Sequence, residues 1–500
     1  MASLTTQKQT LVVSALTLSV LVIGLDVTIL NVALPAISSA LDAGISSLQW
    51  VTNAYILAFA GLMLPVGSLV DRYGRRLALV TGLAIFGCAS VWASLTTTTV
   101  ALTCARGLLG VGAAIIMPAT LATIAAQFEA EDRGKALSIV VMGMGAGIPL
   151  GPIVGGYLID HYTWGAIFLI NVPLVLLAIG AVMWVLPESK DPTAATTDYF
   201  GAVTSTAGLS AVVYGCIEAP GKGWFSPAVL GALTIGALLV GAFVLWERRA
   251  PEPMIDLSLF AKPLFTWGTV NATIASFALF GLLFVVPLYL QVNLGSNAFH
   301  AGLKLLPLIG GFVVGVGLGT RVAGHLGHKI PITAGLVITA AGLAVGTMTT
   351  ETSGFGFISI WLVLAGFGIG AALTPSMDAV LSVLPPERSG SGAAVVMTFR
   401  QVGGALGVAI LGSVLAQAYL DQLPTAGLPA PIAAAAKDSV VSAVTVATSH
   451  HIPALAASAQ SAYLHAMVVV LGVCAGIVLV TAALTALLMP RALRPCCVPT

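Results

Sequence analysis

Residues 21–35 read LVIGLDVTILNVALP, and Asp26 is the one charged residue among them. No other charged residue stands between Lys8 and Asp42. So long an apolar run predicts a transmembrane helix, because about 20 residues rising 1.5 Å each cross the hydrocarbon core of a bilayer. An ionised carboxylate there costs roughly 2.5–3.5 kcal/mol on insertion scales, so it needs water, a partner or a proton. Asp26 either caps or packs a helix or has a function, and we favour function.

The composition of the 500-residue chain indicates a polytopic membrane protein. Hydrophobic residues make up 58% and charged residues 8%, whereas soluble domains carry about 25% charged residues. The net charge of +1 argues against a nucleic-acid-binding surface, which would need a basic patch. The histidines lack metal-ligand spacing, and most cysteines lie in apolar runs as small packing residues. We therefore expect no metal site and no cofactor.

Hydropathy divides the chain into fourteen predicted membrane-spanning helices, so the expected fold class is all-α. We place the spans near residues 11–33, 50–70, 77–97, 100–124, 136–158, 166–187, 199–217, 228–246, 265–291, 302–323, 330–349, 357–383, 393–418 and 464–489. With these spans, fifteen of the 20 Lys and Arg residues lie in loops on the side of the amino terminus. The opposite loops hold Lys222, Lys304 and Lys437. Positive loops face the cytoplasm, so both termini are expected there.

Polar interruptions indicate a plan of six, two and six spans. The expected domains are an N-terminal six-helix bundle, two inserted transmembrane helices with their linkers, and a C-terminal six-helix bundle, at residues 1–187, 188–264 and 265–500. A long outer loop at residues 421–463 precedes the last span. Its portion at residues 431–449 is either a surface helix or a disordered loop.

The link between the second and third spans reads GSLVDRYGRR over residues 67–76, which we call the signature loop. Its glycines permit a tight turn and its carboxylate can accept hydrogen bonds from a helix amino terminus. The arginines alone would suit contact with anionic headgroups, but the spacing favours a gating element that changes its contacts between states. The expected gating residues are Gly67, Asp71, Arg72, Gly74, Arg75, Arg76 and, in the next cytoplasmic loop, Arg133.

Arg106 lies about six residues, or roughly 9 Å, inside the outer end of the fourth span. Asp26 lies about seven residues, or roughly 10 Å, inside the outer end of the first span. If these spans are neighbours, a guanidinium favours the ionised carboxylate while burial favours the protonated one. We therefore favour a proton-coupling pair of Asp26 and Arg106 over two independent snorkelling charges.

The fifth span reads GMGAGIPLGPIVGG over residues 143–156. Prolines weaken helix hydrogen bonding, and repeated glycines flatten one face of the helix. The pattern suits either simple packing of small residues or a bendable hinge between the two bundles, and its density favours the hinge. The expected hinge residues are Gly147, Pro149, Gly151, Pro152, Gly155 and Gly156.

Taken together, these motifs resemble the major facilitator superfamily, and specifically its fourteen-span drug:proton antiporter branch. The matching stretches are the signature loop, the span-4 motif, the antiporter motif of span 5, and the first-span and span-6 motifs of the branch, at residues 67–76, 106–114, 147–156, 25–35 and 164–173. Leu109 stands where a Gln is often found, and Gly165 replaces the usual Arg. The chain is similar to quaternary-ammonium/multidrug exporters and to actinobacterial antibiotic exporters.

The resemblance implies two six-helix bundles around a central cavity, each built of inverted three-helix repeats. Two additional transmembrane helices complete the expected fold. It also implies alternating access and docking of Asp71 at the cytoplasmic side of the C-terminal bundle. The corresponding loop of the second half, residues 317–329, lacks the acidic residue. Only one half therefore carries the complete signature.

The second half is poor in charge. An Asp378–Arg400 pair, with the neighbouring Gln401, would brace an inner gate, while a helix cap or a headgroup contact fits the same residues equally well. The tenth span has no acidic residue, whereas some relatives that export divalent cations have one there. Bis-cationic substrates are therefore less favoured.

Aromatic and sulfur side chains suit an adaptable apolar cavity, because they re-pack around different shapes and aromatic faces hold cations. Each such residue also fits a lipid-facing or core position. With Asp26, the candidates are Asn31, Tyr55, Met117, Met142, Met144, Phe277, Phe280, Phe284, Phe312, Phe367, Met397 and Phe399.

We therefore expect a proton-coupled antiporter that exports amphipathic or cationic drugs or antibiotics from the bacterial cytoplasmic membrane, and not an enzyme. Its expected partners are a lipophilic cation or antibiotic, protons and the lipid bilayer, and we expect a monomer. The phosphate-binding pattern GxxxxGK[ST] does not occur, which argues against ATP-driven transport. The alternatives are a dedicated exporter of one endogenous metabolite or antibiotic, conferring self-resistance, and a non-transporting membrane receptor.

Overall fold

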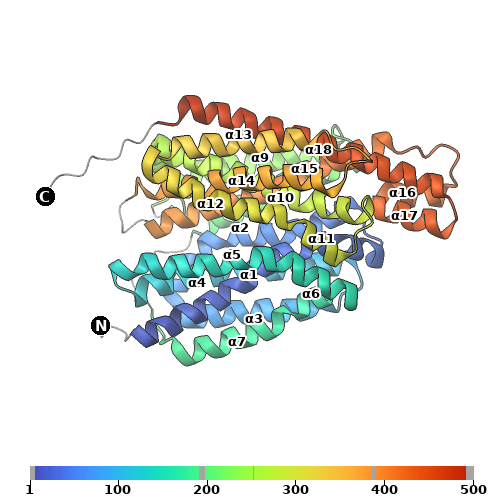
Figure 1. The fold of residues 1–500 in the computed structure, drawn as a ribbon. Helices are drawn as coiled ribbons and strands as arrows, with labels where there is room; N and C mark the ends of the chain where they lie inside the picture. The colour runs from blue at the N-terminus through green and yellow to red at the C-terminus, as the bar shows by residue number, and fades with distance from the viewer. Residues whose placement is uncertain (1–5, 191–197, 252, 385–388, 491–500) are drawn as a thin grey trace. The chain divides into compact units, whose positions relative to one another are not determined.

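The computed structural model describes residues 6–190, 198–251, 253–384 and 389–490 (Figure 1). Over these residues the regular structure is helical without any strand, and fourteen helices are long and apolar enough to cross a membrane. The all-α, fourteen-span prediction is therefore confirmed, and the protein is a multi-pass membrane protein.

By the contacts between its residues, the chain falls into two units. The first unit contains residues 1–254, 290–303 and 425–457, and the second contains residues 255–289, 304–424 and 458–500. The first nine helices lie in the first unit: α1 (Thr6–Leu41), α2 (Ile45–Tyr73), α3 (Arg75–Ser94), α4 (Thr99–Gln127), α5 (Ala130–His161), α6 (Ala166–Leu169), α7 (Asn171–Val185), α8 (Tyr199–Lys222) and α9 (Pro227–Glu247).

The remaining elements follow a short 3-10 helix, η1 (Leu257–Ala261). They are α10 (Pro263–Val292), α11 (Ala298–Lys304), α12 (Leu306–Leu326), α13 (Lys329–Gly346), α14 (Phe355–Leu381), α15 (Ser389–Gln422), α16 (Ala430–Asp438), α17 (Val440–Ser449) and α18 (Pro453–Leu488). The end of α10, nearly all of α11, both α16 and α17, and the start of α18 belong to the first unit.

Two spans are divided by prolines. The sixth span consists of α6 and α7, and the tenth consists of α11 and α12. Pro173 and Pro307 have no N–H, so the carbonyl groups four residues earlier, of Leu169 and Leu303, lose their helical partner. Each interruption falls where that hydrogen bond is missing.

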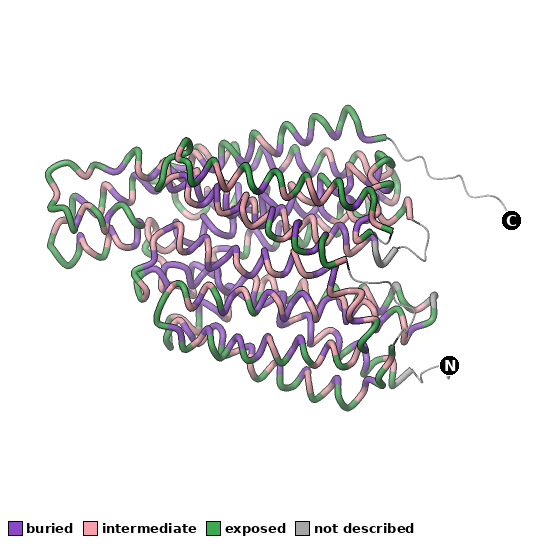
Figure 2. The backbone as a smooth tube through the Cα atoms, turned by 180° about the vertical axis from the view of Figure 1, so that it is seen from behind, coloured by how far each residue is buried: buried purple, intermediate pink, exposed green. Residues whose placement is uncertain are grey.

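The two units share one plan of helix pairing. In the first unit, α1 packs against α5 and α7, α2 against α4, and α3 against α4 and α7. In the second unit, α12 packs against α14 and α13 against α14, while close glycine contacts join α15 to α10 and hydrogen bonds join α18 to α10. Buried, half-buried and exposed positions alternate along these helices (Figure 2).

The outer loop groups mainly with the first unit. The sequence prediction places residues 421–463 in the C-terminal bundle, and by their contacts residues 425–457 belong to the first unit. They form two helices, α16 and α17, which lie side by side (Figure 1), because Ser439 between them is extended, at φ −163° and ψ 158°. The Ser439 side chain caps α17 through the Ser442 N–H and lies 3.2 Å from the Ser38 hydroxyl of α1.

Candidate functional site

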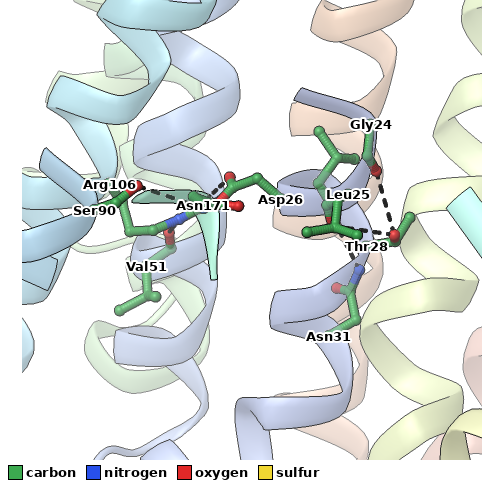
Figure 3. A network of polar contacts seen from close by, with 10 residues as sticks. Gly24, Leu25, Asp26, Thr28, Asn31, Val51, Ser90, Arg106 and Asn171 are labelled. Atoms are coloured by element: carbon green, nitrogen blue, oxygen red, sulfur yellow. Dashed lines mark hydrogen bonds and ion pairs between the residues drawn. The ribbon is translucent and has the colours of Figure 1, made fainter. Parts of the chain in front are cut away.

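Asp26 of α1 and Arg106 of α4 meet in the first unit (Figure 3). Arg106 Nη1 lies 2.5 Å from Asp26 Oδ2, and the two side chains are 2% and 0% exposed. The matching depth that the sequence indicates for the two charges thus corresponds to a direct ion pair. Because both groups are out of contact with solvent, removing either one would leave an uncompensated buried charge.

The second carboxylate oxygen of Asp26 is also occupied. Asn171, the first residue of α7, donates from Nδ2 to Asp26 Oδ1 at 3.2 Å and to Ser90 Oγ at 3.4 Å (Figure 3). Asn171 lies in the span-6 motif, but the sequence analysis assigns it no role. A lone amide within an apolar span, two residues before a proline, is the signal that identifies it.

Arg106 has two further contacts, both on α2. Its Nε donates to the Val51 carbonyl at 3.3 Å, and its Cζ lies 4.5 Å from the centroid of the Tyr55 ring. A carbonyl and an aromatic face both favour a cation. The guanidinium is therefore held by two helices, α1 and α2, besides its own. Protonation of Asp26 would remove the negative member of this arrangement and leave the positive one in place.

The glycines of α5 position α1 around Asp26. A side chain at Gly147 would collide with the Gly24–Leu25 backbone, and one at Gly151 would collide with the Thr28 hydroxyl. Thr28 Oγ1 also lies 3.4 Å from the Gly147 carbonyl oxygen. Within the first unit, the antiporter motif thus brings α5 close to the helix that carries the carboxylate. Its role as a hinge between bundles stays a prediction.

The signature loop is held by a residue that sequence reasoning missed. Gly74 adopts φ 123°, a conformation that favours glycine, between α2 and α3. Asp71 pairs with Arg75 at 2.8 Å. The Glu188 carboxylate accepts the backbone N–H groups of Arg76 and Leu77 at 3.2 and 3.1 Å. The signal for Glu188 was a lone carboxylate directly after the sixth span.

The other gating candidates have fewer described contacts. Arg133 Nε donates to the Phe128 carbonyl at 3.0 Å, and Arg72 is exposed in the last turn of α2. A side chain added at Gly67 would meet nothing within 4 Å. Close helix approach therefore does not explain this glycine in the structure.

The ion pair considered between Asp378 and Arg400 does not form. Among the described residues, Arg400 donates from Nε to Ser276 Oγ at 3.3 Å and from Nη1 to Met377 Sδ at 3.5 Å, and no carboxylate accepts from it. Asp378 follows Met377 directly on α14, and both it and Gln401 are half-buried. The physical reason is that the guanidinium contacts α10 and the thioether preceding the carboxylate.

The aromatic and sulfur candidates for the cavity are distributed over both units. Tyr55, Met117, Phe277 and Phe284 are buried, as is Asn31. The half-buried members are Met144, Phe280, Phe312, Phe367, Met397 and Phe399, and Met142 is 64% exposed. Their role in a substrate cavity stays a prediction. No group of three His, Cys, Asp or Glu side chains that could hold a metal ion occurs among the described residues.

Comparison with known proteins assigns the family. The family model of the Major Facilitator Superfamily matches residues 16–408. The chain is 34% identical over 412 residues to the tetracenomycin C resistance and export protein of Streptomyces glaucescens, covering 82% of this chain and 76% of that protein. It is 34% identical over 439 residues to the methyl viologen resistance protein SmvA of Salmonella typhimurium strain LT2, covering 85% and 87%.

The fold has a solved counterpart. The crystal structure of a bacterial homologue of the human lysosomal transporter Spinster, inward-facing and unoccupied, matches with a TM-score of 0.69 and 17% identity, covering 97% of this chain and 98% of that one. At this identity the likeness concerns the fold alone. The family match and the two relatives above go further, and on them the chain belongs to the Major Facilitator Superfamily.

Proposed function

We propose that this protein is a proton-coupled antiporter that exports amphipathic, often cationic, drugs or antibiotics by alternating access. The observation that carries the proposal is the buried Asp26–Arg106 pair with Asn171 on its second oxygen. A carboxylate inside a membrane helix is a functional group by default. The names of the relatives, which describe resistance and export, support a drug as the other substrate.

The proton acts on the contact between α1 and α4. When Asp26 is ionised, it attracts the Arg106 guanidinium across the 2.5 Å contact. When it is protonated, that attraction is lost, while Arg106 keeps its contacts with Val51 and Tyr55 on α2. Protonation of Asp26 thus weakens the contact between α1 and α4 more than the contact between α2 and α4. A proton can shift the equilibrium between two conformations of a transporter only if it stabilises one of them more than the other, and this unequal effect on the two contacts provides such a difference.

The remaining parts follow the same mechanism. The signature loop serves as a gating element, the glycines and prolines of α5 as a hinge, and Asp378, Arg400 and Gln401 as neighbours of the inner gate. The protein lies in the bacterial cytoplasmic membrane with both termini in the cytoplasm, in accord with the excess of Lys and Arg in the loops on that side. We propose that it acts as a monomer.

The test is transport into proteoliposomes under an imposed pH gradient. Asp26→Asn should abolish coupled transport, because an amide cannot take up a proton, while the protein should still purify in folded form. Asp42→Asn is the matched control: Asp42 is exposed just after the same helix and adopts φ 48°, which asparagine tolerates. Asp42→Asn should keep the wild-type rate. Normal coupled transport by Asp26→Asn would refute the proposal.

A dedicated exporter of one antibiotic is the second candidate, and the name of the tetracenomycin relative favours it. A transport panel of lipophilic cations and several antibiotic classes separates the two, since a dedicated exporter would move one class alone. A non-transporting receptor is the third candidate. It would move no compound in the panel at any pH gradient.

A further inference from the structure

Arg400 of α15 is a half-buried cation with no carboxylate partner among the described residues. The four ion pairs between described residues all lie elsewhere in the chain. Its two hydrogen-bond acceptors are a serine hydroxyl and a thioether, which are neutral, and the thioether is a weak acceptor. Because a guanidinium has five N–H donors, three remain without a partner in the described part of the chain. Arg106, by contrast, is matched by a carboxylate.

The guanidinium lies well inside the membrane-spanning part of the second unit. Ser276, to which its Nε donates, is 13 residues after the first residue of α10, or about 20 Å along the helix. Three helices surround it: its own α15, α10 with Ser276, and α14 with Met377. At such a depth an unpaired cation is unfavourable, and membrane proteins keep one there chiefly for a ligand, an ion or a proton pathway.

The surroundings add an aromatic face. Gly404 lies one turn after Arg400 on α15, and the Phe280 ring of α10 packs against it, where a Cβ at Gly404 would lie 3.1 Å from the ring. Phe280, Met377 and Arg400 are each half-buried, so each presents some surface. Free guanidinium donors beside an aromatic ring and a polarizable sulfur match an oxygen anion attached to an aromatic group.

We propose that Arg400 binds an anionic oxygen of the transported molecule, so that the substrates include aromatic acids and zwitterions bearing a carboxylate, phenolate or enolate. This inference names a substrate class and rests on the proposed function. The oxygen anion accepts from the unpaired Nη donors, and the aromatic body lies against Phe280. Ser276 accepts from Nε and so helps to orient the guanidinium. A lipophilic cation without an acidic group makes no use of Arg400.

The experiment compares two ligands that differ in one group. A rhodamine dye with a free benzoic carboxylate and the ethyl ester of the same dye are bound to the purified protein and followed by fluorescence polarisation. Wild type should bind the acid, and Arg400→Gln should weaken that binding by about 10- to 100-fold, as for the loss of a charged hydrogen bond. Binding of the ester should stay unchanged. Arg400→Lys keeps the charge, so it should retain part of the affinity for the acid.

Other outcomes would overturn the inference. Equal binding of the acid by wild type and Arg400→Gln, or equal weakening of acid and ester, would leave Arg400 with a packing role. A wild-type protein that does not bind the acid would do the same. If Asp378→Asn weakened acid and ester in parallel with Arg400→Gln, the two residues would act as an inner gate instead. Size-exclusion profiles in detergent check that each variant is folded.

Transport separates this inference from the function on which it rests. Arg400-dependent binding of the acid, without movement of either dye under a pH gradient, would overturn proton-coupled export and leave the anion site standing. Movement of both dyes with equal rates in wild type and Arg400→Gln, together with equal binding, would leave export standing and remove the anion site.

Discussion

The two units pair their helices in the same way, but the arginine inside each unit has different partners. Arg106 of the first unit faces the Asp26 carboxylate, whose second oxygen accepts from Asn171. Arg400 of the second unit faces a hydroxyl and a sulfur atom. Among the described residues, the partners of Arg106 therefore include a carboxylate, whereas those of Arg400 do not. A similar framework thus holds the proton site that we propose in one unit and the ligand site that we propose in the other.

The largest expected effect is on stability and has opposite outcomes in the two units. Arg106→Met leaves Asp26 buried without its partner, so we expect a loss of about 3–5 kcal/mol in the free energy of unfolding. Arg400→Met removes an unpaired charge, so its free energy of unfolding should not fall. Denaturant unfolding in detergent measures both. A comparable loss in Arg400→Met would show that Arg400 is compensated in a way that the described contacts do not reveal.

The fold could be predicted from sequence because its signals are long and redundant. Fourteen apolar runs, the bias of Lys and Arg, and dense motifs all indicate one plan. The matching depth of Asp26 and Arg106 predicts their pairing on the condition that the first and fourth spans are neighbours. The grouping of residues 425–457 with the first unit could not be predicted, because an Ala-rich loop carries no pattern that specifies the helix against which it packs. Its contact through Ser38 and Ser439 joins residues 401 positions apart.

The individual hydrogen bonds of the site could not be predicted from the sequence, for a related reason. Asn171 and Glu188 act through hydrogen bonds that depend on the direction of the side chain, and an isolated amide or carboxylate in the sequence does not show that direction. For Asp378 and Arg400, opposite signs suggested a pair, but the guanidinium extends toward Ser276 instead. Depth along a helix can be counted from sequence, whereas the direction in which a long side chain leaves the helix is set by packing.

The second contrast concerns hydrogen bonds between equivalent helix pairs. In the first unit Asn171 of α7 donates to the charged Asp26 of α1, and in the second unit Thr485 of α18 donates to the neutral Asn271 of α10 at 2.7 Å. Hydrogen bonds to charged groups contribute about 1.5–3 kcal/mol, and neutral ones about 0.5–1.5 kcal/mol. Asn171→Ala should therefore lose more stability than Asn271→Ala.

Transport rates sharpen this second contrast. Because Asn171 donates to the carboxylate that we propose to carry the proton, Asn171→Ala should also slow coupled transport in proteoliposomes, whereas Asn271→Ala should keep it near the wild-type rate after correction for folded protein. Equal losses of transport in the two variants would indicate that the first unit has no special part in coupling.

The smallest expected effect is at the loops that connect the second and third helices of each unit. In the first unit, Glu188 accepts two backbone N–H groups at the start of α3, beside Gly74. In the second unit, the turn at Gly327, with φ 79°, precedes α13 in a loop that has no acidic residue of its own. An exposed carboxylate at a helix amino terminus contributes less than about 1 kcal/mol, because solvent screens it.

Glu188→Gln should therefore leave global unfolding nearly unchanged but release the first turn of α3. Hydrogen exchange measured by mass spectrometry should become faster in peptides that contain Arg76 and Leu77, and it should stay unchanged at the start of α13. Glu351→Gln, an exposed carboxylate in the turn before α14, is the matched control and should change neither region. Unchanged exchange at Arg76 and Leu77 in Glu188→Gln would mean that the turn at Gly74 holds α3 without the carboxylate. The two loops would then differ in sequence but not in the order they impose on the helix that follows.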